Sequence, residues 1–172
     1  MAKPTSIFIV DDDPVQLQML TDHLSSMANF SIKTFSTGED ALKQIGDMPN
    51  IVFLDYYLNS VDKNAQDGLD ILQEMKKQSP ATEVIMLSGQ DKIDVAVEVM
   101  KYGAFDYIVK GESAFYRAEK AVYNLYRLAK LKQNAGMYKS LSIAFGVAFV
   151  VMIIIVVYLI TTGKISNNPG WV

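Results

Sequence analysis

The stretch Asn50-Ile51-Val52-Phe53-Leu54-Asp55 is an apolar run that ends abruptly in a carboxylate. A short run of this kind, with β-branched members, predicts a strand that is buried on both faces. Such strands belong to parallel sheets covered by helices, and in open α/β sheets the functional groups lie just beyond the carboxyl ends of the strands. Asp55 stands at that position, so the same six residues predict a fold and a place to look for a site.

Other apolar runs also end in polar or charged residues. Residues 6–10 precede Asp11-Asp12-Asp13, residues 83–87 precede Ser88, and residues 105–109 precede Lys110. A more polar run at 30–35 is typical of a strand near the edge of a sheet. Segments with helical spacing of apolar residues separate these strands. Five strands alternating with five helices predict a doubly wound parallel α/β sheet.

Two local patterns mark helix starts. Asp13-Pro14 combines a favoured N-cap residue with proline at the first helical position, so Asp13 is interpreted as a helix cap. Ser36-Thr37-Gly38-Glu39 resembles a capping box. The single histidine, His23, is interpreted as a surface or boundary residue of the first helix.

Composition excludes several classes of protein. The chain has 172 residues, enough for one ordinary domain and a small addition, and it has no cysteine. Disulfides and thiolate metal sites are therefore excluded. All 19 acidic residues but only 14 of the 16 basic ones lie in residues 1–134, which gives this part a net charge of −5. That charge disfavours nucleic-acid binding.

The composition changes near the C-terminus. Residues 140–163 contain no charge, and residues 141–160 are almost wholly apolar. Twenty helical residues are about 30 Å long, which is the thickness of the hydrocarbon core of a membrane. We therefore predict a domain at 1–133, a juxtamembrane linker at 134–140, a transmembrane helix at 141–161 and a short tail at 162–172. A buried core helix is the alternative, but the domain is complete without it.

The distribution of basic residues predicts the orientation of this helix. Arg127, Lys130, Lys132 and Lys139 precede the apolar segment, whereas only Lys164 follows it. By the positive-inside rule the N-terminal domain lies in the cytoplasm and the chain is a single-pass protein of the inner or cytoplasmic membrane.

The strand ends together predict a phosphate site. Asp11, Asp12 and Asp55 would repel one another unless a cation held them. Mg²⁺ suits a site of a few carboxylates that keeps several waters and awaits a phosphate. The ammonium of Lys110 and the hydroxyl of Ser88 could contact phosphoryl oxygens. The arrangement favours phosphoryl transfer onto a carboxylate.

These motifs resemble a response-regulator receiver domain of the chemotaxis-regulator type, over about residues 6–131. The matching pieces are Val10-Asp11-Asp12-Asp13-Pro14, Leu54-Asp55, Gly68-Leu69-Asp70-Ile71-Leu72, Ile85-Met86-Leu87-Ser88-Gly89 and Gly103-Ala104-Phe105-Asp106-Tyr107-Ile108-Val109-Lys110. The resemblance implies a flavodoxin-like (βα)5 sheet of strand order 2-1-3-4-5. It implies Asp55 as phosphoacceptor, with Mg²⁺ bound by Asp11, Asp12, Asp55 and the backbone carbonyl of Tyr57. It also implies phosphoryl contacts from Ser88 and Lys110, and a switch role for the aromatic ring of Tyr107.

The sequence departs from the family in three places. The connection at 56–67 is longer than usual and lacks the family's proline. Gly111 follows Lys110 where the family usually has a proline in a cis peptide. No output domain follows, only a helix and the apolar segment.

The expected function is that of a membrane-anchored receiver in two-component signalling. A histidine kinase or a phosphotransfer protein would phosphorylate Asp55, and the signal would pass by partner binding rather than DNA binding. The chain is not expected to be an enzyme, because an aspartyl-phosphate phosphatase usually has a second acid where Tyr57 stands. A membrane scaffold that is indifferent to phosphate is the alternative.

A homodimer is a further expectation. Apolar residues of the last helix recur in steps of three and four, the spacing of a helix-pairing seam. Phe115, Ala118 and Val122 are expected to cover the sheet, whereas Leu125, Leu128 and Ala129 lie toward the apolar segment.

Overall fold

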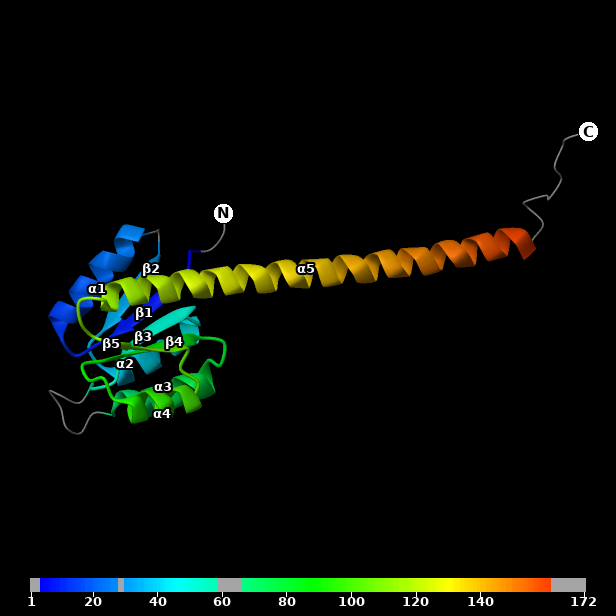
Figure 1. The fold of residues 1–172 in the computed structure, drawn as a ribbon. Helices are drawn as coiled ribbons and strands as arrows, with labels where there is room; N and C mark the ends of the chain where they lie inside the picture. The colour runs from blue at the N-terminus through cyan, green and yellow to red at the C-terminus, as the bar shows by residue number, and fades with distance from the viewer. Residues whose placement is uncertain (1–3, 28–29, 59–65, 162–172) are drawn as a thin grey trace, which may run out of the picture. The chain divides into compact units, whose positions relative to one another are not determined.

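The computed structural model describes residues 4–27, 30–58 and 66–161, except for the side chains of residue 129 and residues 132–141. Five strands alternate with helices along the chain (Figure 1). The elements are β1 (Ser6–Val10), α1 (Pro14–Met27), β2 (Ser31–Phe35), α2 (Gly38–Lys43), the 3₁₀ helix η1 (Ile45–Asp47), β3 (Ile51–Asp55), α3 (Gly68–Gln78), β4 (Glu83–Ser88), α4 (Ile93–Lys101), β5 (Asp106–Val109) and α5 (Ala114–Thr161).

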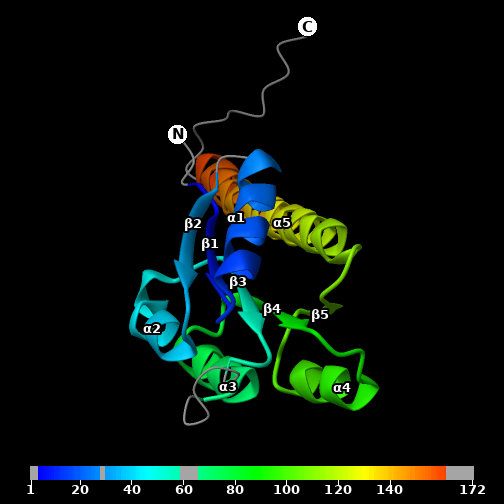
Figure 2. The same cartoon turned by 90° about the vertical axis from the view of Figure 1, so that its left-hand side faces the viewer.

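The strands form one sheet in the order β2-β1-β3-β4-β5, and all of its pairs are parallel. This confirms the predicted order and places β2 at an edge. Figure 2 shows α1 and the first part of α5 over one face of the sheet, with α2, α3 and α4 over the other.

Burial explains why the strands are apolar. Every residue of β3 is buried, and in β1 only Ser6 is not. Side chains from both strands, among them Phe8, Val52 and Leu54, pack with Ile71, Leu72 and Met75 of α3 in the main core cluster. A strand covered by helices on both faces has no polar side, which is why these runs do not alternate.

Helix caps agree with the sequence in one case and correct it in another. Val15 N–H donates to Asp13 Oδ1 at 2.8 Å, so Asp13 caps α1 as predicted. In α2 the N-cap is Thr37, whose Oγ1 accepts from the Asp40 N–H at 3.2 Å. The predicted capping box had Ser36 as the N-cap, one residue before the observed N-cap Thr37. The sequence did not separate the two, because both Ser and Thr are favoured at this position.

The chain divides into two compact units, 1–123 and 124–172, each described here by itself. In the first unit Ala118 and Val122 are buried, as expected of residues that cover the sheet. In the second unit Leu125 is buried, whereas we expected it to belong with Leu128 to the part of the helix that does not cover the sheet.

The second unit contains most of α5, which is helical through the predicted linker at 134–140. Its residues Ser142–Thr161 are long and apolar enough to cross a membrane, and none of them is buried by the protein. The predicted domain limits at residues 133 and 161 stay predictions.

Candidate functional site

The register of the sheet brings the predicted polar residues to one edge. Val10 pairs with Leu54, Asp55 with Leu87, and Ser88 with Val109. The residues that follow these strands therefore emerge at similar heights. Asp11, Asp12, Asp55, Ser88 and Lys110 all lie at this carboxyl edge, which is where open α/β sheets place functional groups.

The three carboxylates form a cluster. Asp11, Asp12 and Asp55 each offer one oxygen, and these oxygens lie within 4.8 Å of one another. Asp11 and Asp55 are buried, whereas Asp12 is partly exposed. Oxygen donors of this kind, at this density, fit a hard divalent cation such as Mg²⁺. The three carboxylates that the sequence selected as metal ligands are thus brought together, and the role of the Tyr57 carbonyl stays a prediction.

Lys110 is placed between two of these carboxylates. Its Nζ donates to Asp11 Oδ2 at 2.7 Å and lies 3.0 Å from Asp55 Oδ1. The strand ladder fixes its backbone, since Lys110 N–H donates to the Ser88 carbonyl at 2.7 Å. Among the described residues every peptide bond is trans, including the one before Gly111. Lys110 therefore reaches the acidic cluster with glycine at the next position.

Burial controls the ionisation of this group. Burial raises the pKa of Asp55 above its usual value, the charge of Lys110 offsets part of this rise, and the charge of Asp11 adds to it. For Lys110, burial lowers the pKa, but the hydrogen bond to Asp11 and the charges of Asp55 and Asp11 outweigh it and leave the pKa raised. The ammonium thus remains charged beside two buried acids, and Asp55 is sensitive to any further cation.

Asp11 also receives a local hydrogen bond. Its Oδ1 accepts from the Asp13 N–H at 3.0 Å, while its other oxygen is bound by Lys110. Asp13 itself caps α1, so its side chain is committed to the helix. The three consecutive aspartates therefore have different surroundings.

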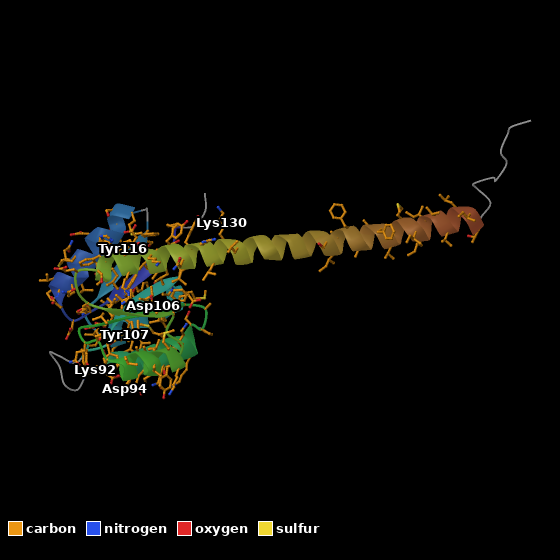
Figure 3. The ribbon with its side chains drawn as sticks, viewed as in Figure 1. Lys92, Asp94, Asp106, Tyr107, Tyr116 and Lys130 are labelled. Carbon is orange, nitrogen blue, oxygen red and sulfur yellow. The ribbon has the colours of Figure 1, made fainter. Side chains whose placement is uncertain are left out.

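Ser88 and Tyr107 converge on Gln90, which the sequence analysis did not select. Ser88 Oγ accepts from the Gln90 N–H at 3.2 Å and lies 3.3 Å from the Gln90 carbonyl. The Tyr107 hydroxyl donates to the same carbonyl at 2.6 Å. Tyr107, on β5, is largely buried (Figure 3). The serine and the aromatic residue are therefore linked through one backbone carbonyl.

Arg117 on α5 was also missed. Its Nη2 donates to the Tyr107 carbonyl at 2.8 Å and lies 3.8 Å from Asp106 Oδ1. Neither residue type nor spacing marks this contact in the sequence, because it depends on how α5 packs on β5. Of the two missed residues, only Gln90 could have been selected from the sequence, because it lies two residues after Ser88.

The backbone after Asp55 is anchored on both sides. Tyr56 N–H donates to the Leu87 carbonyl at 2.8 Å, and the Tyr56 carbonyl accepts from the Gly68 N–H at 2.9 Å. The ring of Tyr57 packs edge-on against that of Tyr56, with centroids 4.9 Å apart. A Cβ at Gly68 would collide with the carbonyl oxygen of Asp55, so α3 can begin this close to the site only with glycine.

The long connection is tied down at its described ends. Leu58 is buried in the main core cluster. At the other end, Gln66 N–H donates to Glu39 Oε1 on α2 at 3.1 Å. Residues 59–65, which include most of the predicted loop, lie outside the described residues.

A cavity of about 440 Å³ adjoins the acidic cluster. Its polar lining residues are Asp11, Gln16, Lys110 and Glu112, and its apolar lining includes Leu20 of α1 and Phe115 of α5. His23, farther along α1, is partly exposed, with its Nε2 3.5 Å from Glu119 Oε2 and its ring beside Phe115. That position agrees with its interpretation as a boundary residue.

Comparison with known proteins gives a consistent result. The family described as "Response regulator receiver domain" matches residues 7–115. The transcriptional regulatory protein MalR of Bacillus subtilis is 28% identical over 138 residues, which are 74% of this chain and 57% of MalR. The nitrogen assimilation regulatory protein NtrX of Azorhizobium caulinodans is 35% identical over 105 residues, 60% of this chain and 22% of NtrX.

A solved structure supports the fold. The CheY-like receiver domain protein of Methanospirillum hungatei superimposes with a TM-score of 0.65 at 24% identity, covering 74% of this chain and 98% of that one. The chain thus spans nearly the whole length of that structure, but less than two thirds of MalR and less than a quarter of NtrX.

Proposed function

Because this chain belongs to the response regulator receiver domain family, we propose that it is a phosphorylation switch whose phosphoacceptor is Asp55. The observation that carries the proposal is the placement of Asp55 at the end of β3, with two further carboxylates and an ammonium around it. An acylphosphate at Asp55 would form where charge can be neutralised from several sides.

The phosphoryl donor is a phosphohistidine of a histidine kinase or a phosphotransfer protein. An oxygen of Asp55 attacks the phosphorus in line with the leaving imidazole, the N–P bond breaks, and an O–P bond forms. Asp11, Asp12, Asp55 and the Tyr57 carbonyl would hold Mg²⁺, which neutralises charge on the transferring group when bound. Catalysis then consists of positioning and electrostatic stabilisation, without a separate substrate to turn over.

Lys110 and Ser88 are assigned to the phosphoryl oxygens. Lys110 already lies 3.0 Å from Asp55 Oδ1, so a small movement of its flexible stem would bring its ammonium onto a phosphoryl oxygen. Ser88 would exchange its contacts with Gln90 for a hydrogen bond to the phosphate. Since Tyr107 shares the Gln90 carbonyl, this exchange would reach its ring and, through it, the surface of α4 and α5.

The second part of the proposal concerns location and output. Residues Ser142–Thr161 anchor the protein in the inner or cytoplasmic membrane, with the receiver in the cytoplasm. Output passes to a protein partner rather than to DNA, a view supported by the net charge of −5 in residues 1–134. MalR is named a transcriptional regulator, but this chain matches only part of it.

Labelling with a small acyl phosphate and Mg²⁺ tests the switch. The wild-type protein should gain one phosphoryl group by mass spectrometry, and Asp55→Asn should gain none. Asp12→Ala should label poorly because it loses a metal ligand. Asp13→Asn is the matched control, since asparagine also caps helices and Asp13 is committed to α1.

The outcome separates the possible functions. A switch accepts phosphate and holds it, a phosphatase releases it in repeated turnovers, and a phosphate-indifferent scaffold does neither. Normal labelling of Asp55→Asn would overturn the assignment of the phosphoacceptor.

A further inference from the structure

Beyond the receiver, α5 exposes an apolar strip. Leu128 and Leu131 are 45% and 55% exposed, although both are large apolar side chains. They lie three residues apart, so they share one side of the helix. The neighbouring Arg127 is also exposed. So is Lys130, which Figure 3 labels on α5. Arg127, four residues before Leu131, borders this apolar strip. Nothing within the described part of its unit covers the strip.

The sequence continues this strip toward the apolar segment. From Leu128 and Leu131, steps of four and three lead to Ala135 and Tyr138. Their side chains lie outside the described residues, so only their positions along α5 are used here. The alternating steps are those of the a and d positions of a heptad, and α5 is helical across all four residues. The strip, defined here as residues 128, 131, 135 and 138, is called the stalk seam.

We propose that the stalk seam pairs in parallel with the same seam of a second copy of this chain. The proposal rests on the membrane anchoring proposed above. Two copies inserted in one membrane run in the same direction, and each residue of the stalk stands level with its own counterpart. A heptad seam buries a and d residues against identical residues at the same height, so the sequence is complementary to itself without another partner. Confinement to a membrane also raises the effective concentration of the two stalks.

Charge gives this pairing a distinguishing property. No acidic residue follows Glu119, and Arg127 and Lys132 occupy the heptad positions beside the seam. Paired stalks therefore bring like charges together, and salt should strengthen the pairing by screening their repulsion. The alternative is that the stalk binds an anionic lipid surface through the same basic residues. Salt would then weaken the binding of the stalk.

The lack of cysteine allows a direct test in the full-length protein in native membranes. Single substitutions Leu128→Cys and Leu131→Cys place thiols in the seam, and Tyr126→Cys and Lys130→Cys are exposed controls on other sides of the same helix turns. Under mild oxidation the seam positions should form disulfide-linked dimers at least about fivefold more than the controls, because a disulfide needs closely placed Cα atoms.

Raising the salt from about 50 mM to about 500 mM should increase cross-linking at Leu131→Cys. In the Leu131→Cys protein, a second substitution Leu128→Lys should reduce the cross-linking. The control substitution Tyr126→Lys should leave the cross-linking unchanged. Equal cross-linking at all four positions, or a decrease with salt, would overturn the seam.

Membrane fractionation separates the two levels of the proposal. A protein that pellets with membranes but shows a flat cross-linking profile refutes the seam and leaves the anchor standing. A protein found in the soluble fraction refutes the anchor and the seam with it. Phosphate labelling of Asp55 is measured independently of both.

Discussion

Removing the positive charge of Lys110 should destabilise the receiver, and Lys110→Met is the appropriate change because it keeps most of the hydrocarbon stem. The ammonium lies 2.7 Å from Asp11 Oδ2 and 3.0 Å from Asp55 Oδ1, and both acids are almost completely buried. Breaking a buried ion pair by removing one partner costs about 3–5 kcal/mol. Lys110 keeps 21% of its side chain exposed, so water can reach the acids and we expect the lower end, about 3 kcal/mol.

The measurement is thermal unfolding of the full-length protein in detergent with a chelator present. For a domain of this size the expected loss corresponds to a decrease in Tm of about 10 °C. In an Asp55→Asn background, Lys110→Met should cost about half as much, because one of its two carboxylate partners is gone. Added Mg²⁺ should also reduce the cost, since it would supply the missing positive charge and bind the folded state.

The comparison of backgrounds makes the reasoning refutable. If Lys110→Met lowered the free energy of unfolding equally in the wild-type and Asp55→Asn proteins, the pairing of Lys110 with Asp55 would contribute nothing. A loss that persisted unchanged in both Asp55→Asn and Asp11→Asn proteins would point to packing of the stem as its cause.

Three further outcomes are expected. Gly68→Ala should lower the free energy of unfolding by about 2 kcal/mol or more, since its Cβ meets the Asp55 backbone, whereas Gly111→Ala, which meets nothing within 4 Å, should change it little; calorimetry compares them. Burial raises the pKa of Asp55 above 3.8, so the charged carboxylate opposes folding at pH 7 and its protonation favours folding as the pH falls. Without metal, Asp55→Asn should therefore have a higher free energy of unfolding than wild type at pH 7, and this difference should become smaller in acid. A difference that stays constant with pH would contradict the prediction. Protease added outside intact cells should remove only residues beyond Thr161, and digestion of the receiver would contradict the proposed orientation.

Sequence reasoning located the strands because each is an apolar run between polar ends. Strands buried on both faces leave little ambiguity, and β1 and β4 begin at the predicted residues. β3 begins at Ile51, the second residue of the stretch that predicted it. β2 and β5 each begin one residue later than predicted, at Ser31 and Asp106. Strand ends depend on the last ladder hydrogen bond, which local composition does not specify.

The acidic cluster could be predicted because residues directly following parallel strands share one edge. The pairing of Lys110 with Asp11, 99 residues apart, could not be predicted, since it depends on how the side chains that follow β1 and β5 meet across β3 and β4. Gln90 and Arg117 were missed for a similar reason: one acts through a backbone carbonyl, and the other reaches β5 from a helix. The burial of Leu125 was not expected, because helical periodicity shows which residues share a side of a helix and not how far along the helix that side is buried.

The anchored ends of the connection after β3 have a consequence for how this protein can diversify. Leu58 is held in the core, and Gln66 is held by Glu39, so the segment between them can be exchanged without a change in the geometry of Asp55. The entropy of closing a loop increases only slowly with its length, so insertions there cost little stability. Under the proposed function, substitutions in residues 59–65 would therefore change which kinase or target is recognised and leave the phosphoacceptor site as it is.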